Sequence, residues 1–213
     1  MILRISVLIC FALVLSEMCW GQTINANPVE IAFNGGVIGG VTLSQIHGDG
    51  YGGFNKLGYN IGAVVEMRRS KSRALQICVL YNEKGSRRVP NTQTGDFNTE
   101  AYRYRYIDIP LSIIYRYENI EATVGLQPSI LISEEHDDGD GGGYYTTNDL
   151  YEWDLGWIIG LRTQYGNHTH IFTRLTQSAI AIGPGQDDPL TWWDRKTRNM
   201  TLEFGVIVLV KSI

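Results

Sequence analysis

Apolar and polar side chains alternate along most of the chain from residue 31 onward. In each stretch, most residues at every second position are apolar, and many of the positions between are small or polar. A period of two residues is typical of β-strands with two different faces and does not fit the spacing of an amphipathic helix. The pattern recurs in the segments 31–43, 59–67, 75–81, 107–115, 120–130, 155–161, 171–175 and 200–210. We therefore predict about eight strands of membrane-spanning length.

The connections between these segments alternate between short and long. The short ones are 69–73, 118–119 and 166–167, and the long, polar ones are 45–57, 85–101, 133–152 and 176–198. A membrane barrel inserted from one side has short turns on the periplasmic side and long loops outside. With an even number of strands, both termini are then expected on the periplasmic side.

Alternation alone does not tell which face points inward, because a soluble lipocalin-type barrel has apolar side chains inside. Side-chain volume favours the opposite arrangement. The polar set contains many small residues, such as Gly40, Gly62, Gly160 and Gly205, which suit the narrow lumen of an eight-stranded barrel. The apolar set is bulky and would overfill that lumen, so we predict that it faces lipid.

Aromatic residues of the apolar set support this choice because they gather near both ends of the strands. Two aromatic girdles are expected of a barrel that sits in lipid. The candidates are Tyr59, Tyr81, Trp153 and Trp157 near the long loops, and Phe33, Tyr115, Tyr117 and Tyr165 near the short turns. The predicted fold is an all-β, eight-stranded antiparallel up-and-down transmembrane barrel.

Composition narrows the class of protein further. The chain has 213 residues, a formal net charge of -4 and a mean hydropathy of -0.10, with no stretch that resembles a linker. One domain is expected, and the acidic balance disfavours a nucleic-acid partner. Only a closed β-barrel crosses a membrane with so polar an average composition.

The first residues resemble an export signal. A basic start at Arg4 is followed by an apolar run over 5–15 and by a small-residue pattern at 19–21. That run is shorter than the about 20 residues of a membrane-spanning helix. We predict a cleaved signal peptide over 1–21 and a barrel domain over 22–213, in which Cys78 is the only cysteine and no internal disulfide forms.

Five stretches of the chain form recognisable motifs: Gly35–Ser44 (GGVIGGVTLS), Leu80–Gly85 (LYNEKG), Tyr106–Leu111 (YIDIPL), Val124–Leu131 (VGLQPSIL) and Gly156–Leu161 (GWIIGL). In these stretches the chain resembles the PorT-like outer-membrane β-barrel family of Bacteroidetes-type bacteria. The segment YIDIPL followed by Pro128 is the most specific part of the resemblance, which covers nearly all of the mature chain.

The resemblance implies an eight-stranded barrel in the outer membrane, placed there by the barrel insertion machinery. It brings no catalytic residue and no cofactor; most members have no known activity, and some serve the secretion of other proteins. Two features depart from the family. The chain ends in Lys211, Ser212 and Ile213 rather than in an aromatic residue, and Thr42 stands where the family often has Asn.

Charged residues also fall on the face opposite the apolar set. The predicted lumen network consists of Glu66, Arg68, Asp108, Arg116, Arg162, Arg174 and Glu203, with Glu121, Asp154 and Lys211 beside them. An isolated buried charge costs several kcal/mol, so these groups are expected to pair. They could line an ion path, but an eight-stranded barrel leaves room only for side chains, which favours a plug.

Other candidate sites are weaker. The acidic loop 133–145 offers Asp137, Asp138 and Asp140 to Ca²⁺ but lacks a spaced bidentate Glu, and His168 with His170 has no evident third metal ligand. We predict neither a metal nor a cofactor. Serine stands near histidine at the outer rim, as in some lipid-modifying barrels. These pairs are Ser44 with His47 and Ser133 with His136.

Trp192 and Trp193 stand in a long loop, where paired tryptophans bind a partner or lie at the membrane interface. The leading hypothesis is a non-enzymatic outer-membrane barrel with a plugged polar lumen, surrounded by lipid, that is structural or binds an unidentified protein through its outer loops. The alternatives are an outer-membrane lipid-modifying enzyme and a soluble periplasmic lipocalin-like binder.

Overall fold

The computed structural model describes residues 31–48, 52–90, 99–139, 143–147, 149–183 and 197–211. The predicted signal peptide over 1–21 and the pair Trp192 and Trp193 lie outside these ranges. Within them, no helix is long and apolar enough to cross a membrane.

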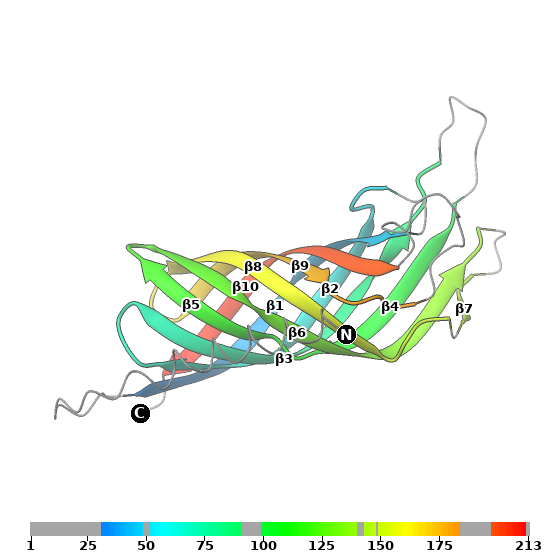
Figure 1. Ribbon diagram of the computed structural model, residues 1–213. Helices are drawn as coiled ribbons and strands as arrows, with labels where there is room; N and C mark the ends of the chain where they lie inside the picture. The colour runs from blue at the N-terminus through cyan, green and yellow to red at the C-terminus, as the bar shows by residue number, and fades with distance from the viewer. Residues whose placement is uncertain are drawn as a thin grey trace. The chain divides into compact units, whose positions relative to one another are not determined.

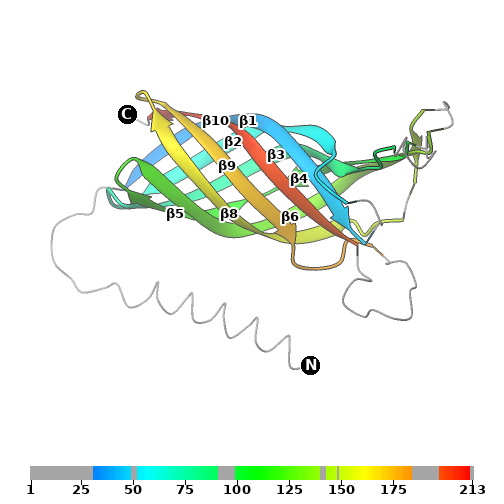
Figure 2. The same cartoon turned by 90° about the horizontal axis from the view of Figure 1, so that it is seen from above.

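The described residues form one sheet that closes on itself (Figure 1). Its strands are β1 (Ala32–His47), β2 (Lys56–Arg68), β3 (Arg73–Arg87), β4 (Ala101–Asp108), β5 (Leu111–Tyr117), β6 (Ile120–Asp137), β7 (Tyr145–Thr146), β8 (Trp153–Tyr165), β9 (Thr169–Ser178) and β10 (Arg198–Lys211). All neighbours pair antiparallel, and β10 pairs with β1 over 34–47 to close the ring (Figure 2). The predicted eight-stranded barrel is confirmed: β4 and β5 together form one of its eight strands, and β7 is a short addition to β6.

The interruption between β4 and β5 follows from Pro110, which has no N–H to donate to the sheet. The ladder resumes at once on both sides. The Ile109 amide donates to the Pro128 carbonyl at 2.8 Å, and the Pro110 carbonyl accepts from the Cys78 amide at 3.0 Å. The wall therefore stays hydrogen bonded across the break.

The alternation of connections agrees with the prediction. Strands β2 and β3, β5 and β6, and β8 and β9 are joined by the short turns 69–72, 118–119 and 166–168, whose tight geometry places Glu118 and Gly166 at positive φ. The first residues of β1 pair with the last of β2 and of β10, so both ends of the barrel domain lie at the short-turn end.

The four predicted long loops are partly strand. Strand β3 continues to Arg87, β4 begins at Ala101 and β6 continues to Asp137, so 85–87, 101 and 133–137 are paired residues. Polar residues occupy both faces here, with Glu135 on the outer face and Ser86 and Glu134 buried on the inner face. The two-residue alternation depends on one apolar face and is lost where both faces are polar.

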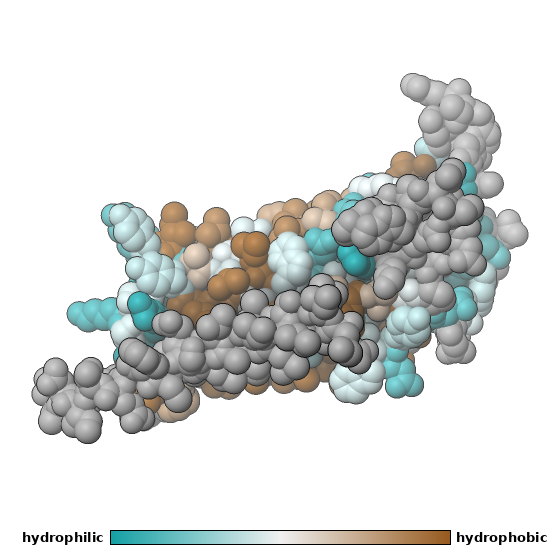
Figure 3. All heavy atoms as spheres, in the orientation of Figure 1, coloured by the Kyte–Doolittle hydropathy of each residue, from teal (hydrophilic) through white to brown (hydrophobic). Residues whose placement is uncertain are grey.

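Side chains of the apolar set lie on the outer face of the barrel, and brown apolar side chains gather along its middle in Figure 3. Typical exposed members are Val37, Ile61, Ile113 and Val206. The lumen is not wholly polar, which corrects the prediction. A cluster of buried apolar residues lies inside: Ile38, Val64, Cys78, Leu80, Phe172, Ile207 and Leu209. We call it the apolar layer.

Glycine permits close approach where the ring closes. Gly40 of β1 pairs with Gly205 of β10. A Cβ atom on Gly205 would lie 2.3 Å from the Gly39 carbonyl oxygen and 2.7 Å from the Phe172 ring. The absence of these side chains therefore lets the apolar layer fill a narrow lumen.

Candidate functional site

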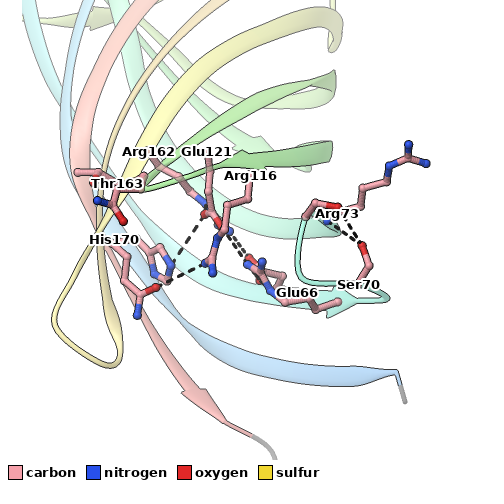
Figure 4. Close-up of polar contacts among 12 residues, drawn as sticks. Glu66, Ser70, Arg73, Arg116, Glu121, Arg162, Thr163 and His170 are labelled. Atoms are coloured by element: carbon pink, nitrogen blue, oxygen red, sulfur yellow. Dashed lines mark hydrogen bonds and ion pairs between the residues drawn. The ribbon is translucent and has the colours of Figure 1, made fainter. Parts of the chain in front are cut away.

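The lumen contains a charged cluster near the short turns, which we call the lower charged layer: Glu66, Arg68, Arg116, Glu121 and Arg162. Arg162 pairs with Glu121 and, at 2.5 Å, with Glu66. Arg68 lies 2.6 Å from the Glu66 carboxylate, and Arg116 lies 2.6 Å from the Glu121 carboxylate. Figure 4 shows Glu66, Arg116, Glu121 and Arg162 converging from β2, β5, β6 and β8. Both carboxylates are at most 1% exposed, so nearly all their stabilisation comes from these guanidinium groups.

Above this cluster, the lumen becomes apolar. Along β2, Val64 stands between Glu66 and Asn60, and along β9, Phe172 stands between His170 and Arg174. The apolar layer therefore separates two charged regions. Its signal in the sequence is a local break of the alternation, where apolar residues become consecutive, as at 77–80 and 206–210.

The second charged region, the upper charged layer, consists of Lys84, Asp108, Arg174 and Glu203. Arg174 pairs with Glu203 at 2.5 Å, and these residues face each other in register on β9 and β10. Lys84 pairs with Asp108 at 2.9 Å. All four side chains are at most 7% exposed.

Amide side chains connect these two pairs. Asn82 donates to Asp108 at 2.9 Å and to Glu203 at 3.0 Å, whereas Gln127 donates to Asp108 at 2.9 Å and Asn60 to Glu203 at 3.3 Å. Each carboxylate thus has several donors. Closer to the long loops, Asp154 accepts from Ser178 at 2.7 Å.

The structure assigns partners that the sequence does not reveal. Of the seven predicted network residues, Glu66 meets Arg68 and Arg162, and Arg174 meets Glu203. Arg116 meets Glu121 instead of any of the seven, and Asp108 meets Lys84, which sequence reasoning missed. Lys84 shares its strand face with Cys78, Leu80 and Asn82, and this spacing was the available signal.

Free space in the lumen is unevenly distributed. Beside the apolar layer, a cavity of about 20 Å³ is lined by Ile38, Ile158, Phe172 and Ile207 among others. That is room for roughly one water molecule. At the short-turn end, a cavity of about 430 Å³ is lined by Ala32, Asn34, Glu66, Arg68, Arg116, Gln164, Asn167, His168, His170 and Leu209.

The eight predicted girdle residues lie on the outer face in two groups. Phe33, Tyr115, Tyr117 and Tyr165 lie toward the short turns, where each is at least half exposed. Trp153 begins β8 at the long-loop end, Trp157 follows four residues later on the same strand face, and the Tyr59 and Tyr81 rings lie 5.6 Å apart.

Beyond the apolar band, the extended parts of β3, β4 and β6 carry ion pairs on the outer face. Arg103 lies 3.6 Å from Glu83 and 3.3 Å from Glu135, and Arg105 pairs with Glu135 at 2.5 Å. We call these parts, together with β7 and Tyr144, the outer extension.

Aromatic rings complete the outer extension. The Arg103 guanidinium lies 3.8 Å from the centroid of the Tyr144 ring, and the Tyr102 and His136 rings stack at 4.3 Å. The Tyr145 hydroxyl is 2.9 Å from His136 Nδ1. This surface is therefore held by specific polar and aromatic contacts, whereas Tyr144 and Tyr145 stay exposed.

The serine and histidine pairs considered for catalysis do not come together. Ser44 is buried in the lumen, where its hydroxyl donates to the Lys56 carbonyl, whereas His47 is exposed on the other strand face. The Ser133 hydroxyl accepts from Arg105, and His136 contacts Tyr102 and Tyr145.

Two of the residues considered for metal binding make other hydrogen bonds. His168 Nδ1 lies 3.1 Å from the Leu209 carbonyl, and Asp137 accepts from the Gly139 amide. Asp140 lies outside the described residues. Within the described ranges, no three His, Cys, Asp or Glu side chains are grouped to hold a metal ion.

Solved structures similar to this chain are small outer-membrane proteins. Ail of Yersinia pestis, in complex with a heparin analogue, is 10% identical at a TM-score of 0.48, with 84% of this chain and 99% of Ail covered. Neisserial surface protein A is 13% identical at 0.48, with 82% and 96% covered. OprG of Pseudomonas aeruginosa is 10% identical at 0.41, with 85% and 96% covered.

No curated protein matches the chain. A family model does: the model described as outer membrane protein beta-barrel domain matches residues 20–179. This match spans well over half of the sequence and agrees with the closed antiparallel ring. The chain therefore belongs to this family of β-barrels of the bacterial outer membrane.

Proposed function

We propose that this protein is a non-enzymatic outer-membrane anchor with a plugged lumen, and that its outer extension binds a partner protein. The observation that carries the proposal is the outer extension itself. It continues the barrel wall past the apolar band as paired strand and bears charges and aromatic rings on its outer face.

The contents of the lumen support the plug. Two charged layers are separated by an apolar layer, and the space beside that layer is about 20 Å³. A hydrated ion that crossed would lose its water among apolar side chains, which is costly. The buried carboxylates are already occupied by guanidinium, ammonium and amide groups, so a permeating cation would compete with ion pairs.

The residue types of the outer extension favour a protein partner. Tyrosine and arginine are enriched at the centres of protein interfaces, where they bury large areas at a low entropic cost. Arg103 lies against the Tyr144 ring, the next residue Tyr145 contacts His136, and both tyrosines are exposed. Because ion pairs already hold side chains of the outer extension in place, binding would lose less conformational entropy.

Placement in the PorT-like branch, with a role in the secretion of other proteins, is a finer part of the same proposal. Its support is the segment Tyr106–Leu111 with Pro128. Ile109 donates to the Pro128 carbonyl, and the Asp108 carboxylate accepts from Lys84, Asn82 and Gln127. These residues thus keep the wall hydrogen bonded at the break between β4 and β5 and take part in the buried network around Asp108. Unchanged protein secretion in a deletion strain would contradict this role.

Photo-crosslinking in living cells tests partner binding. A photo-reactive amino acid replaces Tyr145, which is 46% exposed in the outer extension, or Tyr117, which is 71% exposed at the short-turn end. We expect a discrete crosslinked species from position 145 that position 117 does not give. The absence of any crosslink at 145, or the same species from both positions, would contradict the proposal.

A further inference from the structure

The cavity at the short-turn end has the chemistry of a binding site for an anion. It holds about 430 Å³, and its lining includes Arg68, Arg116, His168 and His170. Short turns of bacterial outer-membrane barrels face the periplasm. The cavity is thus accessible from the side opposite the outer extension, and its role is independent of the proposed partner binding.

The charges of the lower charged layer do not cancel. It contains the guanidinium groups of Arg68, Arg116 and Arg162 and only the carboxylates of Glu66 and Glu121. Each of the four oxygens of these carboxylates already accepts from at least one guanidinium. The cluster therefore has an excess of positive charge, and no carboxylate oxygen in it lacks a cationic partner.

Donors in this region remain available. Arg116 binds Glu121 through Nε, and its Nη2 has only a contact of 3.5 Å to Gln164. Arg68 Nη1 is buried without a hydrogen-bond partner. An arginine with a free pair of terminal N–H groups suits the two oxygens of a carboxylate or phosphate.

His170 is an independent sign of a ligand. Its side chain is 5% exposed, it lines the cavity, and neither ring nitrogen has a hydrogen-bond partner. Glu121 Oε2 lies 3.9 Å from Nε2, beyond hydrogen-bond distance. Buried polar groups are nearly always satisfied, so an unpartnered imidazole at a cavity wall indicates that something else binds there.

We propose that this cavity binds a small oxyanion, a carboxylate or phosphate group on a periplasmic small molecule. Arg116 binds its oxygens, and the side chains of Arg68 and His170, whose unpartnered nitrogens are buried at the cavity wall, turn toward the anion to donate further hydrogen bonds. Amides of Asn34, Gln164 and Asn167 line the rest of the cavity and suit the polar remainder of such a molecule.

Imidazole NMR signals of the refolded mature chain test this inference. The chain has four histidines. His168 and His170 line the cavity and report on binding, whereas His47 and His136 lie toward the long loops and serve as internal controls. The protein, held in a phosphate-free non-ionic detergent, is titrated with sodium succinate or inorganic phosphate. Sodium chloride at equal ionic strength is the reference.

We expect saturable shifts of the His168 and His170 signals with at least one of the two anions, and none of His47 or His136. Saturation with succinate only, or with phosphate only, identifies the oxyanion. Shifts that never saturate, or that sodium chloride reproduces, would overturn the proposal.

Matched variants locate the site. Arg116→Gln should weaken the affinity about tenfold, since it removes a charged hydrogen-bond donor. Arg73→Gln removes an arginine at the same end that points away from the cluster (Figure 4), and it should leave the affinity unchanged. Gln164→Glu adds a negative charge without breaking an ion pair, so it tests the site even if Arg116→Gln fails to fold. Equal affinity in all three variants would refute the assignment.

Discussion

The pair between Arg174 and Glu203 allows a sharp test of how the lumen is stabilised. The two residues are direct neighbours on β9 and β10 and pair at 2.5 Å. Glu203 is fully buried, and Arg174 is 7% exposed. Removing one partner leaves the other charge in a region with little water, and this costs about 3–5 kcal/mol.

The contacts that remain in each single variant predict which one loses more stability. In Arg174→Met, Glu203 still accepts from Asn60 and Asn82, so the loss of stability should be about 3 kcal/mol. In Glu203→Gln, the guanidinium keeps no carboxylate partner, and the loss should be about 4 kcal/mol. The double variant leaves neither charge without a partner. It should therefore lose about 4 kcal/mol rather than the sum of the two single losses, about 7 kcal/mol, which is a coupling of about 3 kcal/mol.

Urea unfolding in lipid vesicles, followed by tryptophan fluorescence and by the heat-modifiable gel shift, gives the free energies of unfolding for this cycle. The control combines Arg174→Met with Glu121→Gln, which lies in the lower charged layer beyond the apolar layer, and should be additive within about 0.5 kcal/mol. Additive losses for Arg174 and Glu203 would show that both groups are separately hydrated, which would refute a dry upper layer.

Two further predictions concern the wall. Val206→Arg places a charge on the exposed apolar face and should cost about 2–4 kcal/mol in lipid by the same urea assay, whereas a similar cost in Val206→Leu would contradict the lipid-facing assignment. Gly205→Ala forces a Cβ against the Gly39 carbonyl and the Phe172 ring and should cost about 1–3 kcal/mol. Gly35→Ala, with no atom within 4 Å, is its control and should cost less; equal losses would exclude the steric reason.

Much of the barrel could be predicted because its two faces meet different surroundings. Residues such as Ile61 and Val65 must be apolar where they face lipid. Because successive side chains of a strand point to opposite faces, this requirement produces an apolar residue at every second position of the sequence. The same requirement does not apply to Arg103 or Glu135, which lie beyond the apolar band. The strand pairing of the outer extension therefore leaves no periodic signal.

The interior could be predicted only as a set of residues. Glu66, Arg162 and Arg174 were assigned to the lumen from their strand face, but their partners depend on the register between strands distant in sequence, which local patterns do not encode. Lys84 is missing from the predicted set, although its spacing from Asn82 puts it on the inner strand face, and only the pairing of β3 with β4 brings it to Asp108. The cavity near His170 is lined from six strands, β1, β2, β5, β8, β9 and β10, and has no sequence signature of its own.

Single-channel recording in planar bilayers tests most directly whether the lumen is plugged. The refolded wild-type barrel is compared with a variant in which Phe172→Ala and Ile207→Ala thin the apolar layer. We predict no stable conductance steps from the wild type. We predict measurable steps from the thinned variant, because water could then fill the lumen between the two charged layers and ions could cross. Large, stable steps from clean wild-type protein would contradict a plugged lumen.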